Sequence, residues 1–303
     1  MTSTIGFGTA DELPVSLQIP GYRLRRPVGS DAVGLWFDCE QTSLGRKLTI
    51  KVLKPQYEQH AGAHRDFLAE MDRLIELQHP HLLTVIDSRR EDPLALVTER
   101  ITAQTLATML EPGKPIPPDE ALKHALGCAQ ALAYLHSEGF THKNFTPRLV
   151  SISSGGVGRI VTFRNIVPFK ELAALRSKLV QDPLYIAPEQ IGGEDEIGPK
   201  ASTYQLGAIL FHLLAGAAPH STGDAKAIAL AHYREPFPSL KSRQPFLKSG
   251  ILDLVGACTR KDPVERPEMS EVVERIEAIL EGKDDDAGGA TSAPRARRRR
   301  RRR

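Results

Sequence analysis

The feature that most constrains the fold is a change of hydrophobic pattern near residue 105. Between residues 22 and 102 the sequence consists mostly of short strand-like runs, such as YRLRRPV, GLWFDCE and KLTIKVL, which Gly, Ser and Asp separate. One helical pattern, at 63–78, interrupts them. Later in the chain, helices are predicted at 117–139, 203–214, 223–232, 248–258 and 270–281. Strands followed by helices predict an α+β fold with a small β-rich part and a larger α-helical part.

The ends of the chain are expected to lie outside this folded part. Residues 1–20 are expected to form a flexible leader. The segment 283–303, KDDDAGGATSAPRARRRRRRR, cannot build a core and is expected to be a disordered Arg-rich tail. The folded domain is therefore expected at 21–282, with one lobe at 21–100 and the other at 101–282.

Cysteine usage and hydropathy favour a cytoplasmic protein. The three cysteines, Cys39, Cys128 and Cys258, are far apart and odd in number, which fits a reducing compartment and neither a disulfide framework nor a zinc site. The start of the chain has no signal-peptide pattern. The longest apolar run, at 206–219, is too short to span a bilayer, so no transmembrane segment is expected.

Six motifs occur in a fixed order along the chain. They are VGSDAVGLW at 28–36, LTIK at 48–51, LALVTERI at 94–101, FTHKNFTPRLV at 140–150, VTFRN at 161–165 and DPLYIAPEQ at 182–190. One such motif would be weak, but six in register are specific. Together they resemble the protein kinase family, in particular the bacterial serine/threonine kinases, over about residues 20–282. The resemblance implies a bilobal fold, with the β-rich part as N-lobe and the helical part as C-lobe.

The resemblance also implies roles for residues that this sequence keeps. Gly29 and Gly34 match the glycine-rich loop over the nucleotide phosphates, in which Asp31 replaces the middle glycine. Lys51 matches the lysine that grips phosphate, and Glu70 matches the helix glutamate that pairs with it. Thr98 matches the gatekeeper and Glu99 the first hinge residue, and Glu99 would join Lys51, Glu70 and the two glycines in binding the nucleotide if one binds. Residues that match the family's fold-stabilising groups are also present: Leu74, Val85, His142 and Phe163 in the stack that links the lobes, and Glu189 and Arg266 in the salt bridge of the larger lobe.

The groups that the family uses for catalysis are replaced. By the resemblance, the catalytic aspartate is Asn144, the nearby lysine is Thr146, the metal-binding asparagine is Leu149 and the metal-binding aspartate is Thr162. An amide does not accept a proton near neutral pH, and leucine cannot bind a cation. No intact catalytic residue and no metal site are therefore expected.

The nucleotide pocket also departs from the family pattern. The residues that would sandwich adenine are Trp36, Thr49 and Ser151. Tryptophan buries about 150–250 Å², so Trp36 is large enough to occupy the adenine position itself. The alternative is that Trp36 points to the opposite face of its strand, as a one-residue register shift would require. Arg164, at the position of a glycine, either pairs with Glu70 or Asp182 or is exposed.

Three functions remain open from the sequence. The first is a pseudokinase that acts as a regulatory or scaffolding module, binds a protein partner and needs no cofactor. The second is an atypical active serine/threonine kinase that uses ATP and magnesium, which Lys51 and Glu70 favour. The third is binding of nucleic acid or an anionic surface through Arg297 to Arg303, for which the alternative is a solvated terminus without a partner. The eight arginines in 287–303 leave 3 − 8 = −5 for residues 1–286.

Overall fold

The computed structural model describes residues 17–30, 33–101, 104–153, 155–161, 165–175, 182–192 and 197–283. Several predicted features lie outside these residues. They are Asp31 of the glycine motif, the run Thr162, Phe163 and Arg164, most of the leader, and the tail with Arg297 to Arg303.

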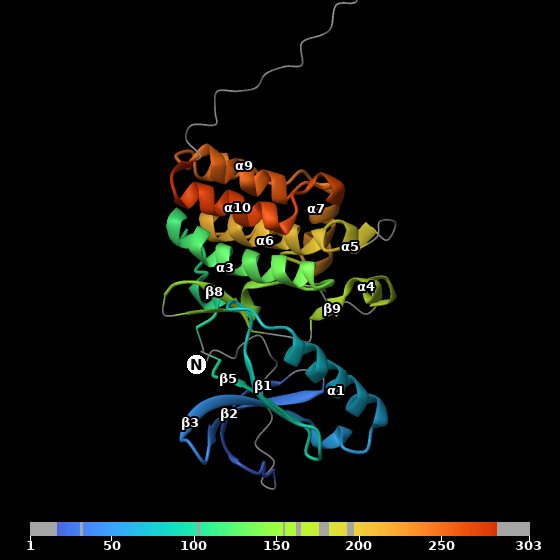
Figure 1. Ribbon diagram of the computed structural model, residues 1–303. Coiled ribbons are helices and arrows are strands. Elements are labelled where there is room, and N and C mark those ends of the chain that lie inside the picture. The colour runs from blue at the N-terminus through green and yellow to red at the C-terminus, as the bar shows by residue number, and fades with distance from the viewer. Residues whose placement is uncertain are drawn as a thin grey trace, which may run out of the picture.

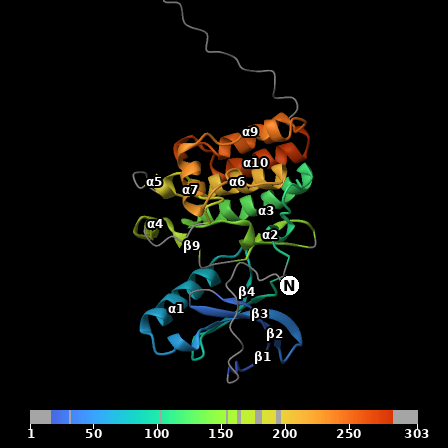
Figure 2. The same ribbon diagram turned by 180° about the vertical axis from the view of Figure 1, so that it is seen from behind.

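The N-lobe is a five-stranded antiparallel sheet with one long helix. The strand order is β1-β2-β3-β5-β4, and helix α1 lies on the side of the sheet that faces the helical part (Figure 1, Figure 2). The bounds are β1 Tyr22–Ser30, β2 Gly34–Gln41, β3 Arg46–Leu53, η1 Pro55–Tyr57, α1 Ala61–Glu76, β4 Val85–Arg89 and β5 Ala95–Glu99.

Alternation along β2 and β3 gives the sheet two different faces. Leu35, Phe37 and Ile50 belong to an apolar cluster on the outer face, which Ile19 helps to cover. Trp36 belongs instead to the large cluster that includes α1 and the helical part. Successive side chains of a strand point to opposite faces, so Thr49 and Lys51 lie on the same inner face as Trp36.

The C-lobe packs long helices around α6, with two short strand pairs, β6–β9 and β7–β8, on the side toward the N-lobe (Figure 1). Almost every residue of α6 is buried, because α3 and α9 both pack against it. The bounds are α2 Leu106–Met109, α3 Pro118–Ser137, β6 Phe140–His142, η2 Pro147–Leu149, β7 Val150–Ile152, β8 Gly158–Ile160, β9 Ile166–Pro168, α4 Phe169–Leu175, α5 Glu189–Gly192, α6 Lys200–Ala215, α7 Ala225–Arg234, α8 Leu240–Arg243, α9 Ser249–Cys258, η4 Pro263–Glu265 and α10 Met269–Leu280.

The predicted α+β bilobal architecture is confirmed. The six long helices begin and end within a few residues of the predicted ranges. The short helices α2, α4, α5 and α8 were not predicted, because three of them have only four residues and α4 has seven, too few to show a helical period. In the described part of the chain, no helix is both long and apolar enough to cross a membrane.

Candidate functional site

The ion pair between Lys51 and Glu70 lies at the centre of the inner face. The ammonium Nζ of Lys51 donates to both carboxylate oxygens of Glu70, at 2.8 and 2.7 Å. Two aromatic rings flank the same ammonium, with centroids at 5.5 Å for Trp36 and 5.3 Å for Phe67. Only 1% of Lys51 is exposed. The ion pair therefore fixes α1 against the sheet from within an apolar enclosure.

The glycine motif lies directly on this lysine. A Cβ atom added at Gly34 would be 2.4 Å from Cε and 2.9 Å from Cγ of Lys51. Any larger residue would therefore displace the lysine side chain, which gives Gly34 a packing reason that does not depend on a ligand. Gly29 pairs with Trp36 across β1 and β2.

Trp36 covers the inner face beside the lysine. It pairs directly with Lys51 in the β2–β3 register, and its side chain is 1% exposed. Directly opposite residues of an antiparallel pair project to the same face. The alternative in which Trp36 points to the opposite face is therefore wrong.

At the other end of the inner face, the segment that joins the lobes bonds to β3. The backbone N–H of Ile101 donates to the hydroxyl Oγ1 of Thr49 at 3.0 Å. The hydroxyl of Thr98 donates to the carbonyl of Glu99 at 3.0 Å. Thr49, Thr98 and Glu99 could be selected from the sequence, but Ile101 could not, because its contact uses a backbone N–H, which every residue except proline has.

The side chain of Glu99 ties the two lobes together. Its carboxylate accepts a hydrogen bond from the N–H of Thr84 at 2.8 Å and one from each terminal nitrogen of Arg159. One of these two nitrogens also donates to the carbonyl of Leu82. Partial burial alone would raise the pKa of Glu99, but the Arg159 and Thr84 hydrogen bonds outweigh it and hold the pKa below the ordinary value of 4.5.

We predict that Arg159→Ala lowers the free energy of unfolding by about 1–2 kcal/mol at neutral pH. A carboxylate with a depressed pKa stabilises the folded state above its ordinary pKa of 4.5, and loses that contribution as the pH falls through its folded value. The difference between the native chain and the variant, measured by urea unfolding, should therefore shrink below pH 4.5. If the difference in unfolding free energy is the same at neutral pH and below pH 4.5, the pairing of Arg159 with Glu99 is contradicted.

The loop FTHKNFTPRLV holds its replaced residues in ordered positions. The side-chain oxygen of Asn144 accepts the N–H of Asp182 at 3.4 Å. Thr146 and Leu149 are 4% and 7% exposed, and Leu149 ends the short helix η2. His142 is buried, and burial lowers its pKa to about 3, so its ring is neutral and contributes by packing edge-on against Phe145.

Two glutamines that the sequence analysis did not select anchor this loop. Gln205 of α6 accepts the buried N–H of Phe145 at 2.9 Å and donates to Gln190 at 3.1 Å. Gln190 donates in turn to the carbonyl of Lys143 at 3.0 Å. Ser202, one turn before Gln205 on α6, bonds to His136 and donates to the carbonyl of Pro199.

We predict that Gln205→Ala costs about 1–3 kcal/mol, because the N–H of Phe145 is then buried without an acceptor. Gln205→Glu keeps an oxygen at the same place. With its buried carboxyl protonated at about pH 4, it also keeps a donor toward Gln190, so at that pH it should cost less than Gln205→Ala. Thermal unfolding of the two variants at that pH measures the difference. If they unfold at the same temperature, the oxygen of Gln205 does not anchor the loop.

Comparisons with known proteins agree with this architecture. The profile described as protein kinase domain matches residues 22–276. The chain belongs to the protein kinase domain family.

Curated relatives of this kinase domain are bacterial. A serine/threonine-protein kinase of Myxococcus xanthus is 31% identical over 267 residues, which are 84% of this chain and 32% of the relative. The probable serine/threonine-protein kinase PknB of Lactococcus lactis is 29% identical over 244 residues, 80% of this chain and 39% of the relative. PrkC of Bacillus subtilis is 27% identical over 255 residues, 84% of this chain and 39% of the relative. The chain thus spans well under half the length of these relatives.

At the position that the resemblance gives to a metal ligand in the loop at 140–150, the side chain cannot bind a cation. Among the residues that the structure describes, no group of three or more His, Cys, Asp or Glu could hold a metal ion. The side chain of Leu149, at the position of the family's metal-binding asparagine, presents only carbon atoms and cannot bind a cation. Thr162 lies outside the described residues.

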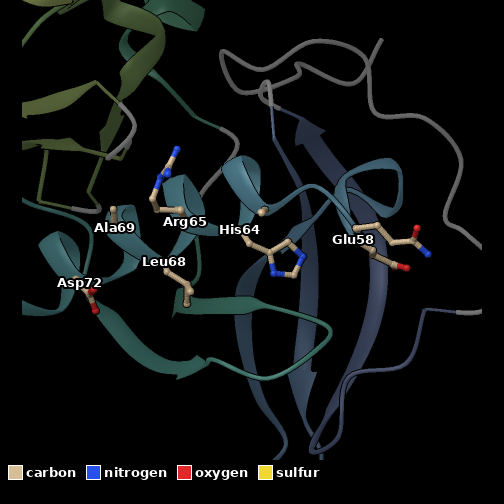
Figure 3. A pocket seen from close by; sticks show the side chains of 8 residues that line it. Glu58, His64, Arg65, Leu68, Ala69 and Asp72 are labelled. Atoms are coloured by element: carbon tan, nitrogen blue, oxygen red, sulfur yellow. The ribbon is translucent and has the colours of Figure 1, made fainter.

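A surface hollow beside α1 is lined by residues of that helix other than Glu70. It has a volume of about 630 Å³, and Glu58, His64, Arg65, Leu68 and Asp72 line it (Figure 3). It is an open surface groove and includes neither Lys51 nor Glu70. We assign it no part in the interlobe site.

Proposed function

We propose that this kinase domain is a pseudokinase: a regulatory or scaffolding module that binds a protein partner and carries out little or no phosphotransfer. The observation that carries the proposal is the chemistry of the loop at 140–150. Asn144 stands where a proton acceptor is required, and buried Leu149 stands where a metal ligand is required. Within this proposal the domain extends over 21–282, needs neither ATP nor magnesium, and works in the cytoplasm.

The contacts that hold the lobes support a binding role. Glu189 and Arg266 form a buried ion pair in the C-lobe, and Glu99 with Arg159 ties the hinge to β8. Leu74 and Val85 lie in the apolar cluster that runs through both lobes. Each of these contacts is made between groups of the chain itself. A fold that holds its own geometry offers a partner a preorganised surface, which lowers the entropic cost of binding.

The test is a phosphotransfer assay on the full chain with ATP and magnesium. Loss of a general base costs about 10²–10⁴-fold in rate, and loss of metal stabilisation costs several kcal/mol more. Against the ~1–100 s⁻¹ typical of kinases, we expect turnover at least about 10⁴-fold slower. Lys51→Arg is the matched control, because it keeps the positive charge beside Glu70. Turnover near the family range that Lys51→Arg removes would overturn the proposal.

An active atypical kinase is the second candidate. The observation in its favour is the close ion pair between Lys51 and Glu70, which the family uses to position nucleotide. If it is correct, the same assay gives turnover that depends on the divalent cation.

Binding through Arg297 to Arg303 remains a prediction, because these residues lie outside the described part of the chain. We predict that, if the tail binds nucleic acid, the logarithm of affinity falls linearly with the logarithm of salt concentration, with a slope of about −0.9 for each phosphate contacted. Deletion of 287–303 should abolish that binding. Affinity that survives the deletion would exclude the tail as the binding segment.

A further inference from the structure

A hydrogen bond joins the inner face of the N-lobe sheet to the hinge. Its donor is a backbone N–H that would otherwise be available to a ligand. The N–H of Ile101, beside the hinge, donates to the hydroxyl of Thr49 at 3.0 Å. Ile101 and Thr49 are 5% and 0% exposed. A donor so deeply buried requires an acceptor, and here the chain supplies its own.

Thr49 is held in this role from two sides. Its own carbonyl lies 3.3 Å from the hydroxyl of Thr98, and it pairs with Thr98 in the β3–β5 register. Threonine is stiff at χ1 because two heavy atoms branch at Cβ. The hydroxyl is therefore aimed at Ile101 by a fixed backbone and a restricted rotamer.

The other end of the same face is closed by different residues. Trp36 and Phe67 enclose the ammonium of Lys51, and Gly34 lies against the lysine stem. The two ends are two residues apart on β3, at Thr49 and Lys51. The protein's own side chains therefore accept the hydrogen bond of the backbone donor at the hinge and cover the ammonium of Lys51.

We infer that the interlobe site of this protein is occupied from within, with Thr49 taking the hinge donor and Trp36 covering Lys51, so that the domain keeps its interlobe geometry without a ligand. The inference deepens the proposed function and rests on it, because it explains how a non-catalytic domain keeps α1 and the hinge in place. Removal of the two side chains should expose a site for a planar heterocycle whose ring nitrogen accepts the N–H of Ile101.

The test uses the full chain, with adenosine and with ATP in the presence of EDTA as probes. The variants are Thr49→Ala, Trp36→Val and their combination. Thr49→Ser is the matched control, because it keeps the hydroxyl. We expect no binding by the native chain or Thr49→Ser at about 1 mM probe. The double variant should bind with a Kd below about 1 mM, and a tenfold excess of probe over that Kd should raise its Tm by about 4 °C.

Amide hydrogen exchange at Ile101 is the second readout, and it needs no ligand. We expect exchange about tenfold faster in Thr49→Ala and unchanged in Thr49→Ser. If the double variant fails to fold, this comparison on the milder single variants decides the question. Equal exchange in both would overturn the role of Thr49.

Failure of this inference can be told apart from failure of the proposed function. A native chain that binds adenosine but transfers no phosphate would overturn internal occupancy and leave the pseudokinase proposal in place. A folded double variant that binds no better than the native chain would also overturn it. A double variant that binds ATP and then transfers phosphate with magnesium would support internal occupancy and overturn the proposal that the loop at 140–150 is inert.

Discussion

Replacing Arg266 with alanine is expected to unfold most of the protein at room temperature. Arg266 is 2% exposed, and its guanidinium donates to both oxygens of Glu189, at 2.7 and 2.8 Å. It also donates to the carbonyls of Arg260, Lys200 and Lys261. The substitution leaves a buried carboxylate without its counter-charge, which typically costs about 3–5 kcal/mol, and removes one donor from each of three carbonyls. Proteins of this kind are stable by only about 5–15 kcal/mol.

Chemical denaturation followed by circular dichroism measures this loss. Arg266→Lys is the control, because it restores the charge but not the fork of donors, and it should recover only part of the stability. A variant Arg266→Ala that unfolds within a few degrees of the native chain would show that the pair with Glu189 does not hold the C-lobe.

Replacing Lys51 with alanine is expected to cost about 3–5 kcal/mol, because Glu70 is then left buried and charged beside Phe67. Glu70 is 5% exposed. For a domain of this size, such a loss lowers Tm by about 10 °C. Trp36 is the only tryptophan, and it lies against the lysine, so its fluorescence reports unfolding at this place.

The double variant Lys51→Met, Glu70→Leu is the matched control. A buried ion pair that is replaced by apolar side chains of similar volume often costs nothing. We therefore expect the double variant to be more stable than Lys51→Ala. If Lys51→Ala and the double variant are equally unstable, the loss comes from packing and not from the uncompensated charge.

The elements and the ion pairs could be predicted from the sequence for two different reasons. Long helices such as α3 and α10 carry a hydrophobic period over several turns, which is a local property of the chain. The pairs between Lys51 and Glu70 and between Glu189 and Arg266 followed from the resemblance, because motif order fixes which residues meet in a shared fold. The structure brings both pairs together.

The contacts that the sequence analysis missed share one physical cause. Gln205 and Gln190 are neutral side chains in helical runs, and a glutamine that bonds to a loop backbone looks like any other glutamine. The donor of Ile101 is its backbone N–H, a group that every residue except proline carries, so the residue type does not reveal its role. Arg159 was missed because its partner, Glu99, lies 60 residues away in the sequence. Each contact depends on the distance between segments that only folding brings together.

The amino-acid sequence by itself determined the order of strands and helices and the chemistry that is missing from the loop at 140–150, since periodicity and side-chain type are properties of the chain. The tertiary structure decided how the remaining groups are used. Whether Trp36 faced the lysine or the outer surface depended on the register of β2 against β3, and whether Thr49 met a hinge donor depended on where Ile101 lies in space. Strand register and the meeting of distant segments are set by packing over the whole domain, which the residue types alone do not specify.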